Sequence, residues 1–131
     1  MKLLPDTHLL LWLVRAVGHT SRLPAEAVAL VENPDNEVYF SAVSVWEVAI
    51  KHGVEKPEFR VDAGVFRRAL LDAGYIELAI MSDHAAAVGS LPRIHKDPFD
   101  RMLVAQALVE GIMLLTVDEV LGRYPGPVKR L

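Results

Sequence analysis

The stretch HKDPFDRMLVAQA, residues 95–107, carries two aspartates three positions apart at the start of an apolar helical pattern. Asp97 followed by Pro98 has the form of a helix N-cap with proline at the first helical position. The cap explains Asp97 without any chemistry. Asp100, in contrast, shares one helix face with Leu103, and that face is expected to pack inward.

A carboxylate on a buried helix face needs a physical reason. The interaction of Asp100 with the helix dipole is worth about 1 kcal/mol at most, whereas burial of an unpaired carboxylate costs several kcal/mol. Arg101 points about 100° away around the helix and is a poor partner. We therefore expect Asp100 to face a cation or a polar cleft.

The composition fits one compact unit. The chain has 131 residues, is 52% hydrophobic and contains no dividing linker, so we expect one domain over residues 1–131. It has no cysteine, which excludes disulfides and thiolate metal sites, and its five histidines lack the pairwise spacing of a zinc site. The net charge of −3 argues only weakly against nucleic-acid binding, because acids that hold metal ions would not repel RNA.

The amino-terminal stretch, MKLLPDTHLLLWLVR, resembles a signal peptide in its lysine and leucines. Pro5, Asp6 and His8 interrupt it, and the apolar run Leu9–Val14 is far too short to span a bilayer. We therefore expect a soluble, cytoplasmic protein that does not contact a membrane.

Short strand-like runs alternate with helical patterns along the chain. Strands are predicted at Lys2–Pro5, Glu37–Phe40, Tyr75–Leu78 and Ile112–Thr116. Helices are predicted at about Thr7–Val17, Pro24–Glu32, Val43–His52, Ala63–Ala73, Ser82–Ser90 and Pro98–Glu110. This alternation is typical of an α/β fold with a central parallel sheet covered by helices on both faces, which is a three-layer α/β/α sandwich. Ligands bind such sheets beyond the carboxyl ends of the strands.

Two acids directly follow predicted strands. Asp6 comes after the first strand, and Pro5 before it fits a strand end. Asp118 comes just after the strand at 112–116. Each is also explained as the N-cap of a following helix, in the case of Asp118 a short one over DEVLGR. Both interpretations place the two acids at the carboxyl edge of the sheet.

Glu47 has two interpretations as well. With Ser44 it matches a capping box, but Ser41, directly after a strand, is the better-placed cap. Counted from that start, Glu47 falls beside Val43 and Ile50 on the apolar side of the helix. A lone carboxylate there is costly unless it is paired, protonated or bound to a metal.

Four carboxylates from four segments are thus predicted at or near one rim. Oxygen ligands without cysteine or a suitable histidine pair favour Mg²⁺ or Mn²⁺ over zinc. Such clusters suit phosphodiester hydrolysis, in which bound metal activates a water and stabilises the departing oxygen. The sequence has neither a P-loop nor a dinucleotide-binding glycine motif.

Four segments resemble, in order, the signature segments of PIN-domain ribonucleases, and among these the VapC-type toxins of prokaryotic toxin–antitoxin systems. They are LLPDTHLLLW, SAVSVWEVAIKHG, HKDPFDRMLVAQA and LLTVD, and the resemblance extends from Met1 to about Tyr124. It implies a five-stranded parallel sheet wrapped by helices, and endonucleolytic cleavage of single-stranded RNA that depends on Mg²⁺ or Mn²⁺. Pro5 departs from the family pattern, which more often has an aliphatic residue there.

The resemblance also implies site residues and partners. It assigns metal binding and catalysis to four acids: Asp6, Glu47, Asp100 and Asp118. It assigns supporting roles to Thr7 and Thr116, while Asp97 stays a cap that supports the site. A cognate VapB-type antitoxin and a homodimer are the expected partners. Because the run Leu9–Val14 is apolar all round, we expect the sheet to cover one side of it and such a partner the other.

Other side chains carry smaller expectations. Candidate contacts to RNA phosphates at the cleft are the basic residues Lys51, His52, Arg93, His95, Lys96 and Arg101, although each taken singly also fits a solvated position. Trp12 and Trp46 are predicted in the core rather than as base-stacking platforms. Met81, Met102 and Met113 are predicted as packing residues.

Two alternatives belong to other classes of protein. A phospho-acceptor receiver domain requires an acidic doublet after the first strand and a lysine after a late strand. Here PDTH offers one acid and LLTVDEV no lysine. A non-catalytic PIN-like binding module would be expected to lose carboxylates that are costly to bury, and the full quartet argues against it.

Overall fold

The computed structural model describes residues 1–14, 22–53 and 59–131. In these ranges the strands are β1 (Lys2–Pro5), β2 (Glu37–Ser41), β3 (Ile76–Leu78), β4 (Met113–Thr116) and β5 (Val128–Arg130). The helices are α1 (Thr7–Leu13), α2 (Ala25–Glu32), α3 (Ala42–Lys51), α4 (Ala63–Asp72), α5 (Ser82–Val88) and α6 (Pro98–Glu110). The predicted α/β class with a central parallel sheet is confirmed.

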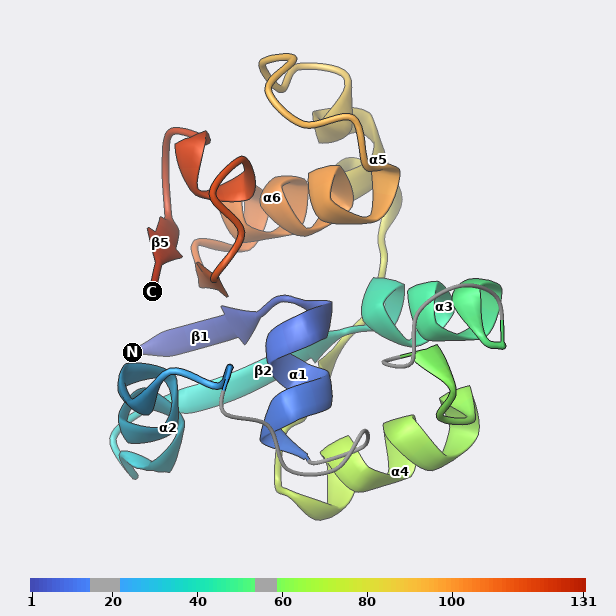
Figure 1. Cartoon of the computed structure of the whole chain (residues 1–131). Coiled ribbons are helices and arrows are strands. Elements are labelled where there is room, and N and C mark those ends of the chain that lie inside the picture. The colour runs from blue at the N-terminus through green and yellow to red at the C-terminus, as the bar shows by residue number, and fades with distance from the viewer. Residues whose placement is uncertain (15–21, 54–58) are drawn as a thin grey trace.

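The five strands form one parallel sheet in the order β3-β2-β1-β4-β5, with β1 at its centre (Figure 1). Pro5 is the last residue of this central strand, where its missing N–H does least harm to the ladder. The next residue restores the pairing, because the Asp6 N–H donates to the Leu115 carbonyl at 2.9 Å. The carboxyl ends of β1, β2 and β4 therefore meet along one edge.

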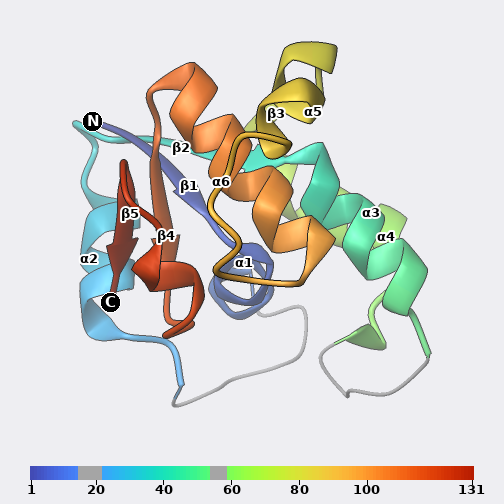
Figure 2. The same ribbon diagram turned by 90° about the horizontal axis from the view of Figure 1, so that it is seen from above.

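Helices cover both faces of the sheet. Figure 1 shows α5 and α6 on one side and α1, α2 and α4 on the other, and Figure 2 shows α6 lying across the sheet with α5 beside it. Neighbouring residues of β1 point to opposite faces: Leu4 packs with Leu103 and Leu114, whereas Leu3 packs with Leu9. This alternation supplies both apolar layers of the sandwich.

Most predicted elements are present with small changes in their ends. Lys2–Pro5 and Pro98–Glu110 match the structure, and residues 15–17 of the predicted first helix lie outside the described residues. The helix expected over residues 118–123 is only a 3₁₀ turn at Leu121–Arg123. The strand β5 was not predicted from the residue pattern, because three half-exposed residues after prolines carry too little periodicity.

Three expectations about burial were wrong. The run Leu9–Val14 was expected to leave one side for a partner, but Leu9–Trp12 are buried within the chain itself and Leu13 and Val14 pack against core clusters. Trp46 is 52% exposed and forms an edge-to-face contact with Phe99, with 4.9 Å between the two ring centres. Trp12, in contrast, is in the core as predicted. Met81 is exposed as well, because it precedes α5 at the surface, while Met102 and Met113 pack against core clusters as predicted.

In the described parts of the chain, no helix is long and apolar enough to cross a membrane.

Two leucines of α6 provide a matched test of the core. Leu103 is fully buried between α6 and the sheet, whereas Leu108 is 44% exposed. We expect Leu103→Ala to lower the free energy of unfolding by about 2–5 kcal/mol, because it leaves a cavity. Leu108→Ala removes the same atoms and is expected to change it by about 0.5 kcal/mol or less. Urea unfolding followed by circular dichroism measures both; equal losses would contradict the assigned layers.

Candidate active site and metal centre

A pocket of about 600 Å³ lies beyond the carboxyl ends of β1, β2 and β4. It is lined by Asp6, His8, Trp12, Arg22, Glu47, Lys51, His95, Asp97, Asp100, Val117 and Asp118. All four acids proposed as metal ligands from the sequence are in this set, and so is Asp97. They come from the ends of β1 and β4, from α3 after β2, and from the start of α6. Parallel strands with right-handed helical connections bring these distant segments to one edge.

Asp6 is almost completely buried, and both of its carboxylate oxygens are occupied within the protein. Oδ1 accepts the Leu9 N–H at 3.0 Å, which makes Asp6 the N-cap of α1. Oδ2 accepts the Thr116 hydroxyl at 2.6 Å. The cap interpretation is therefore correct for Asp6, and it does not compete with a place in the pocket. These two donors hold the carboxylate in one orientation.

Glu47 is the most unusual acid of the pocket. It is 2% exposed, on the second turn of α3, which Ser41 caps by accepting the Val43 N–H. Oε2 accepts a hydrogen bond from the Lys51 ammonium at 2.6 Å. Among the described residues, Oε1 is a buried side-chain oxygen with no hydrogen-bond partner. Such an oxygen is costly to bury, which is a reason to expect a cation there.

Asp97 and Asp100 have the different roles that their spacing predicts. Oδ1 of Asp97 accepts the N–H groups of Phe99 and Asp100 at 2.8 and 3.1 Å and so caps α6. The Asp100 carboxylate points to the pocket, and its Oδ2 lies 3.1 Å from Nε2 of His95. Nδ1 of His95 accepts the Asp97 N–H at 3.2 Å, which leaves the Nε2 proton to face Asp100.

Asp118 closes the rim on the β4 side. Its Oδ1 accepts the N–H groups of Val120 and Leu121 at 2.8 and 3.0 Å, and its Oδ2 lies 3.7 Å from Nε2 of His95. Ligand atoms of His95, Asp100 and Asp118 lie within 4.8 Å of one another, close enough to share one ion. One oxygen of Asp118 thus orders the loop after β4, while the other faces the pocket.

The two threonines sit behind the acids. Thr116 donates to Asp6 and accepts the Asp118 N–H at 3.0 Å, so a single hydroxyl links the acids that follow β1 and β4. Thr7 donates to the Ser44 hydroxyl at 2.9 Å and thereby ties α1 to α3, the helix that carries Glu47. Both hydroxyls are buried.

The crowding of carboxylates alters their acidity. Burial, together with the charges of Asp97, Asp6, Glu47 and Asp118, raises the pKa of Asp100 to about 8. Burial also raises the pKa of Asp6, against the opposing hydrogen bonds from Thr116 and Leu9. Burial raises the pKa of Asp118 too, but its two backbone N–H donors and His95 outweigh this, and the net shift is downward. Without a cation, the pocket favours keeping a proton on Asp100.

The donor set fits a divalent metal. Carboxylate oxygens dominate the pocket, as Mg²⁺ and Mn²⁺ prefer, and Glu47 leaves one buried oxygen without a partner. A cation would offset the repulsion that raises the pKa of Asp100. The residues that line the pocket therefore suit a divalent ion bound among the acids.

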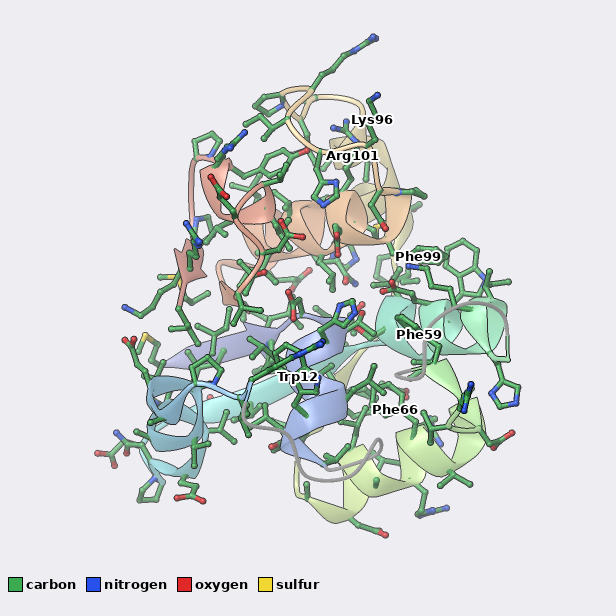
Figure 3. All side chains as sticks on the ribbon, in the orientation of Figure 1. Trp12, Phe59, Phe66, Lys96, Phe99 and Arg101 are labelled. Atoms are coloured by element: carbon green, nitrogen blue, oxygen red, sulfur yellow. The ribbon has the colours of Figure 1, made fainter. Side chains whose placement is uncertain are left out.

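The sequence reasoning assigned the surrounding side chains less well. Lys51 and His95 line the pocket, but the other four basic residues expected near RNA do not. Arg101 instead donates to the Pro92 carbonyl and the Tyr124 hydroxyl, and Figure 3 shows Lys96 and Arg101 on the side of α6 away from the sheet. The pocket residues His8, Arg22 and Val117 carried no motif signal, although His8 lies two positions after Asp6 and Val117 directly precedes Asp118.

The comparisons with known proteins agree with this architecture. The sequence matches the family model of the PIN domain over residues 3–127, and the chain therefore belongs to the PIN-domain family. No curated protein matches the sequence significantly. The fold is similar to that of a chain in the crystal structure of VapBC2 from Rickettsia felis bound to a DNA fragment from their promoter. The TM-score is 0.69 at 13% identity, and the similarity covers 100% of this chain and 99% of that chain.

The family match confirms the PIN-domain part of the resemblance stated from the sequence and rules out the receiver-domain alternative. The strand order is consistent with this, because receiver domains have the order 2-1-3-4-5 and this sheet has β3-β2-β1-β4-β5.

The raised pKa of Asp100 predicts a pH effect on stability. An ordinary aspartate titrates near 3.8, so between about pH 4 and about pH 8 the folded protein holds a proton that the unfolded chain has lost. Without metal, this group therefore makes the protein less stable as pH rises through that window. We expect the Tm of Asp100→Asn minus that of the wild type, in EDTA, to be several degrees more positive at about pH 8 than at about pH 5.

A divalent ion supplies the control for this experiment. Added Mg²⁺ or Mn²⁺ should raise the Tm of the wild type at about pH 8 more than that of Asp100→Asn. A difference between the two proteins that stays constant with pH in EDTA would contradict the assigned electrostatics.

Proposed function

We propose that this protein is an endoribonuclease that depends on Mg²⁺ or Mn²⁺ and cleaves single-stranded regions of RNA, as the toxin of a toxin–antitoxin system. The observation that carries the proposal is the unpartnered, buried Oε1 of Glu47 in a pocket that four further carboxylates line. Such an arrangement destabilises the protein in isolation and becomes favourable around a divalent ion. Membership of the PIN-domain family supports the same conclusion.

In this proposal the four acids hold the metal, Thr116 orients Asp6, and Thr7 ties α1 to the helix that carries Glu47. When bound, the metal supplies an activated water and stabilises the charge that develops on the phosphate and the departing oxygen. The protein's own contribution is preorganisation. Thr116 and the Leu9 N–H fix Asp6, two backbone N–H groups fix Asp118, and α3 holds Glu47 buried. No carboxylate then has to reorient when charge develops.

The pocket is open enough to admit a strand of nucleic acid. Its volume of about 600 Å³ is larger than one or two ions need, and Arg22, Lys51 and His95 contribute cationic or imidazole groups among the acids. RNA in single-stranded form is proposed because its backbone can bend into such a pocket, whereas a duplex is stiff.

We also propose a cognate VapB-type antitoxin and a homodimer as partners. The similarity to a VapBC2 chain over the full length supports the first. For the second, exposed apolar side chains are available on two helices, namely Trp46 and Ile50 on α3 and Val109 on α6. Apolar surface of this kind often marks a protein contact.

Asparagine substitutions at the pocket test the nuclease. We expect Asp6→Asn or Asp100→Asn to lower cleavage of RNA by at least ~100-fold, because each removes a negative charge that holds the metal. Asp72→Asn, an exposed change on α4 outside the pocket, is the matched control and should retain activity. Cleavage is measured on total RNA by mapping new ends, and circular dichroism checks folding.

Chelation provides the independent test. EDTA should abolish cleavage by the wild type, and Mg²⁺ or Mn²⁺ should restore it. Cleavage that persists in EDTA would refute metal dependence. A wild type that binds RNA but never cleaves it, with either metal, would instead favour the non-catalytic binding module.

The dimer has a direct measurement. Light scattering after size exclusion should give about twice the chain mass of 14.5 kDa, and charged substitutions at Trp46 or Ile50 should shift the mass towards that of one chain. A single-chain mass over the whole micromolar range, alone and with antitoxin, would count against this surface as a dimer contact.

A further inference from the structure

Lys51 stands out among the cations of the pocket. It lies four residues after Glu47 on α3, so both side chains share one face of the helix. Its ammonium is 2.6 Å from Oε2 of Glu47, while Oε1 of the same carboxylate has no partner. One oxygen of the Glu47 carboxylate is thus paired with the lysine, and the other can bind a second cation. An ordinary surface pair has both partners in water, whereas this glutamate is buried.

Two aromatic rings hold the same ammonium in place. Nζ of Lys51 lies 5.1 Å from the ring centre of Phe59 and 5.3 Å from that of Phe99. Figure 3 shows both phenylalanines on the side of the molecule that α3 occupies. Cation–π attraction and the carboxylate restrict the position of a side chain that is normally mobile. Even so, the side chain remains 36% exposed and lines the pocket.

The ammonium has more donors than its neighbours use. It carries three N–H groups, and Glu47 accepts one of them. Oδ2 of Asp97 lies 3.7 Å away, beyond hydrogen-bond distance. The Lys51 ammonium can therefore donate to a further acceptor in the pocket. Because the nearby carboxylates already repel one another, a new anion is admissible only together with a metal, as with a phosphate of RNA.

We propose that Glu47 holds Lys51 beside the metal site so that its ammonium contacts a non-bridging phosphate oxygen of the bound RNA strand. This role rests on the proposed ribonuclease function. Lys51 then has two opposite effects: it opposes metal binding through its positive charge, and it stabilises the negative charge of the phosphate during cleavage. A lysine that only stabilised α3 or oriented Glu47 would favour metal binding instead.

The opposite signs can be measured with Lys51→Gln, which keeps an amide donor and removes the charge. Mn²⁺ binding to the full chain without RNA, followed by electron paramagnetic resonance, should become severalfold tighter in this variant. Lys129→Gln removes the same charge from β5, outside the pocket and from an ion pair with Glu26, and should bind Mn²⁺ like the wild type.

Cleavage is measured on the same proteins at saturating Mn²⁺. Lys51→Gln should cleave total RNA at least ~10-fold more slowly than the wild type, Lys51→Arg should recover part of the rate because it restores the charge, and Lys129→Gln should be unchanged. Binding of a fluorescent 2′-O-methyl oligonucleotide in the presence of Mn²⁺ should weaken in Lys51→Gln.

Each other outcome overturns part of the scheme. If Lys51→Gln binds Mn²⁺ more weakly, Lys51 merely holds Glu47, and the phosphate contact is refuted. If Lys51→Gln cleaves RNA at the wild-type rate, the contact is refuted while the ribonuclease stands. If the wild type shows no metal-dependent cleavage, the proposed function fails and the role of Lys51 with it.

Discussion

The repulsion among buried carboxylates is the constraint on which the pocket depends. Asp6 and Glu47 are buried and Asp100 is largely so. Burial, together with the charges of Asp97, Asp6, Glu47 and Asp118, raises the pKa of Asp100 to about 8. A fold that only needed stability would replace these groups with apolar ones, because a packed apolar cluster is as stable as buried charge or more so. Their presence at the edge of a well-packed core indicates that the protein gives up some stability to keep them, as the proposed metal site requires.

The surrounding structure is arranged to tolerate that repulsion. Asp6, Glu47, Asp97 and Asp118 each have at least one carboxylate oxygen with a defined donor. These donors are backbone N–H groups, the Thr116 hydroxyl and the Lys51 ammonium. The caps of α1 and α6 thus have a double use, since the same side chains that begin the helices face the pocket or support an acid that does. At the start of α3, the Ser41 hydroxyl donates to Oε1 of Gln106 in α6 at 2.5 Å. This hydrogen bond connects the helix that carries Glu47 with the helix that carries Asp100. Rigid carboxylates of this kind are what a metal-dependent reaction requires.

Much of the fold follows from local pattern. The alternation of short apolar strands with amphipathic helices predicted the parallel sheet and most element ends, and Pro5 and Pro98 marked a strand end and a helix start. The pattern failed where local signal is weak. The edge strand β5 has three residues, and its pairing with β4 is a tertiary contact. Exposure also depends on what lies opposite a helix. The sequence pattern therefore wrongly placed Trp46 in the core and wrongly gave the run Leu9–Val14 a side for a partner, although Leu9–Trp12 are buried within the chain.

For the pocket, the sequence by itself determined which acids are candidates for a site. Asp100 and Glu47 fall on apolar helix faces, and Asp6 and Asp118 follow strands. Helical and strand periodicity are local properties, so one chain is enough to show them. Only the tertiary structure decided which groups accompany these acids. His95 against Asp100, Lys51 between two phenylalanines and Thr116 against Asp6 are contacts between side chains of separate elements, set by strand order and helix packing. The unpartnered oxygen of Glu47 is also decided by the tertiary structure, because whether an oxygen lacks a partner depends on all the groups around it.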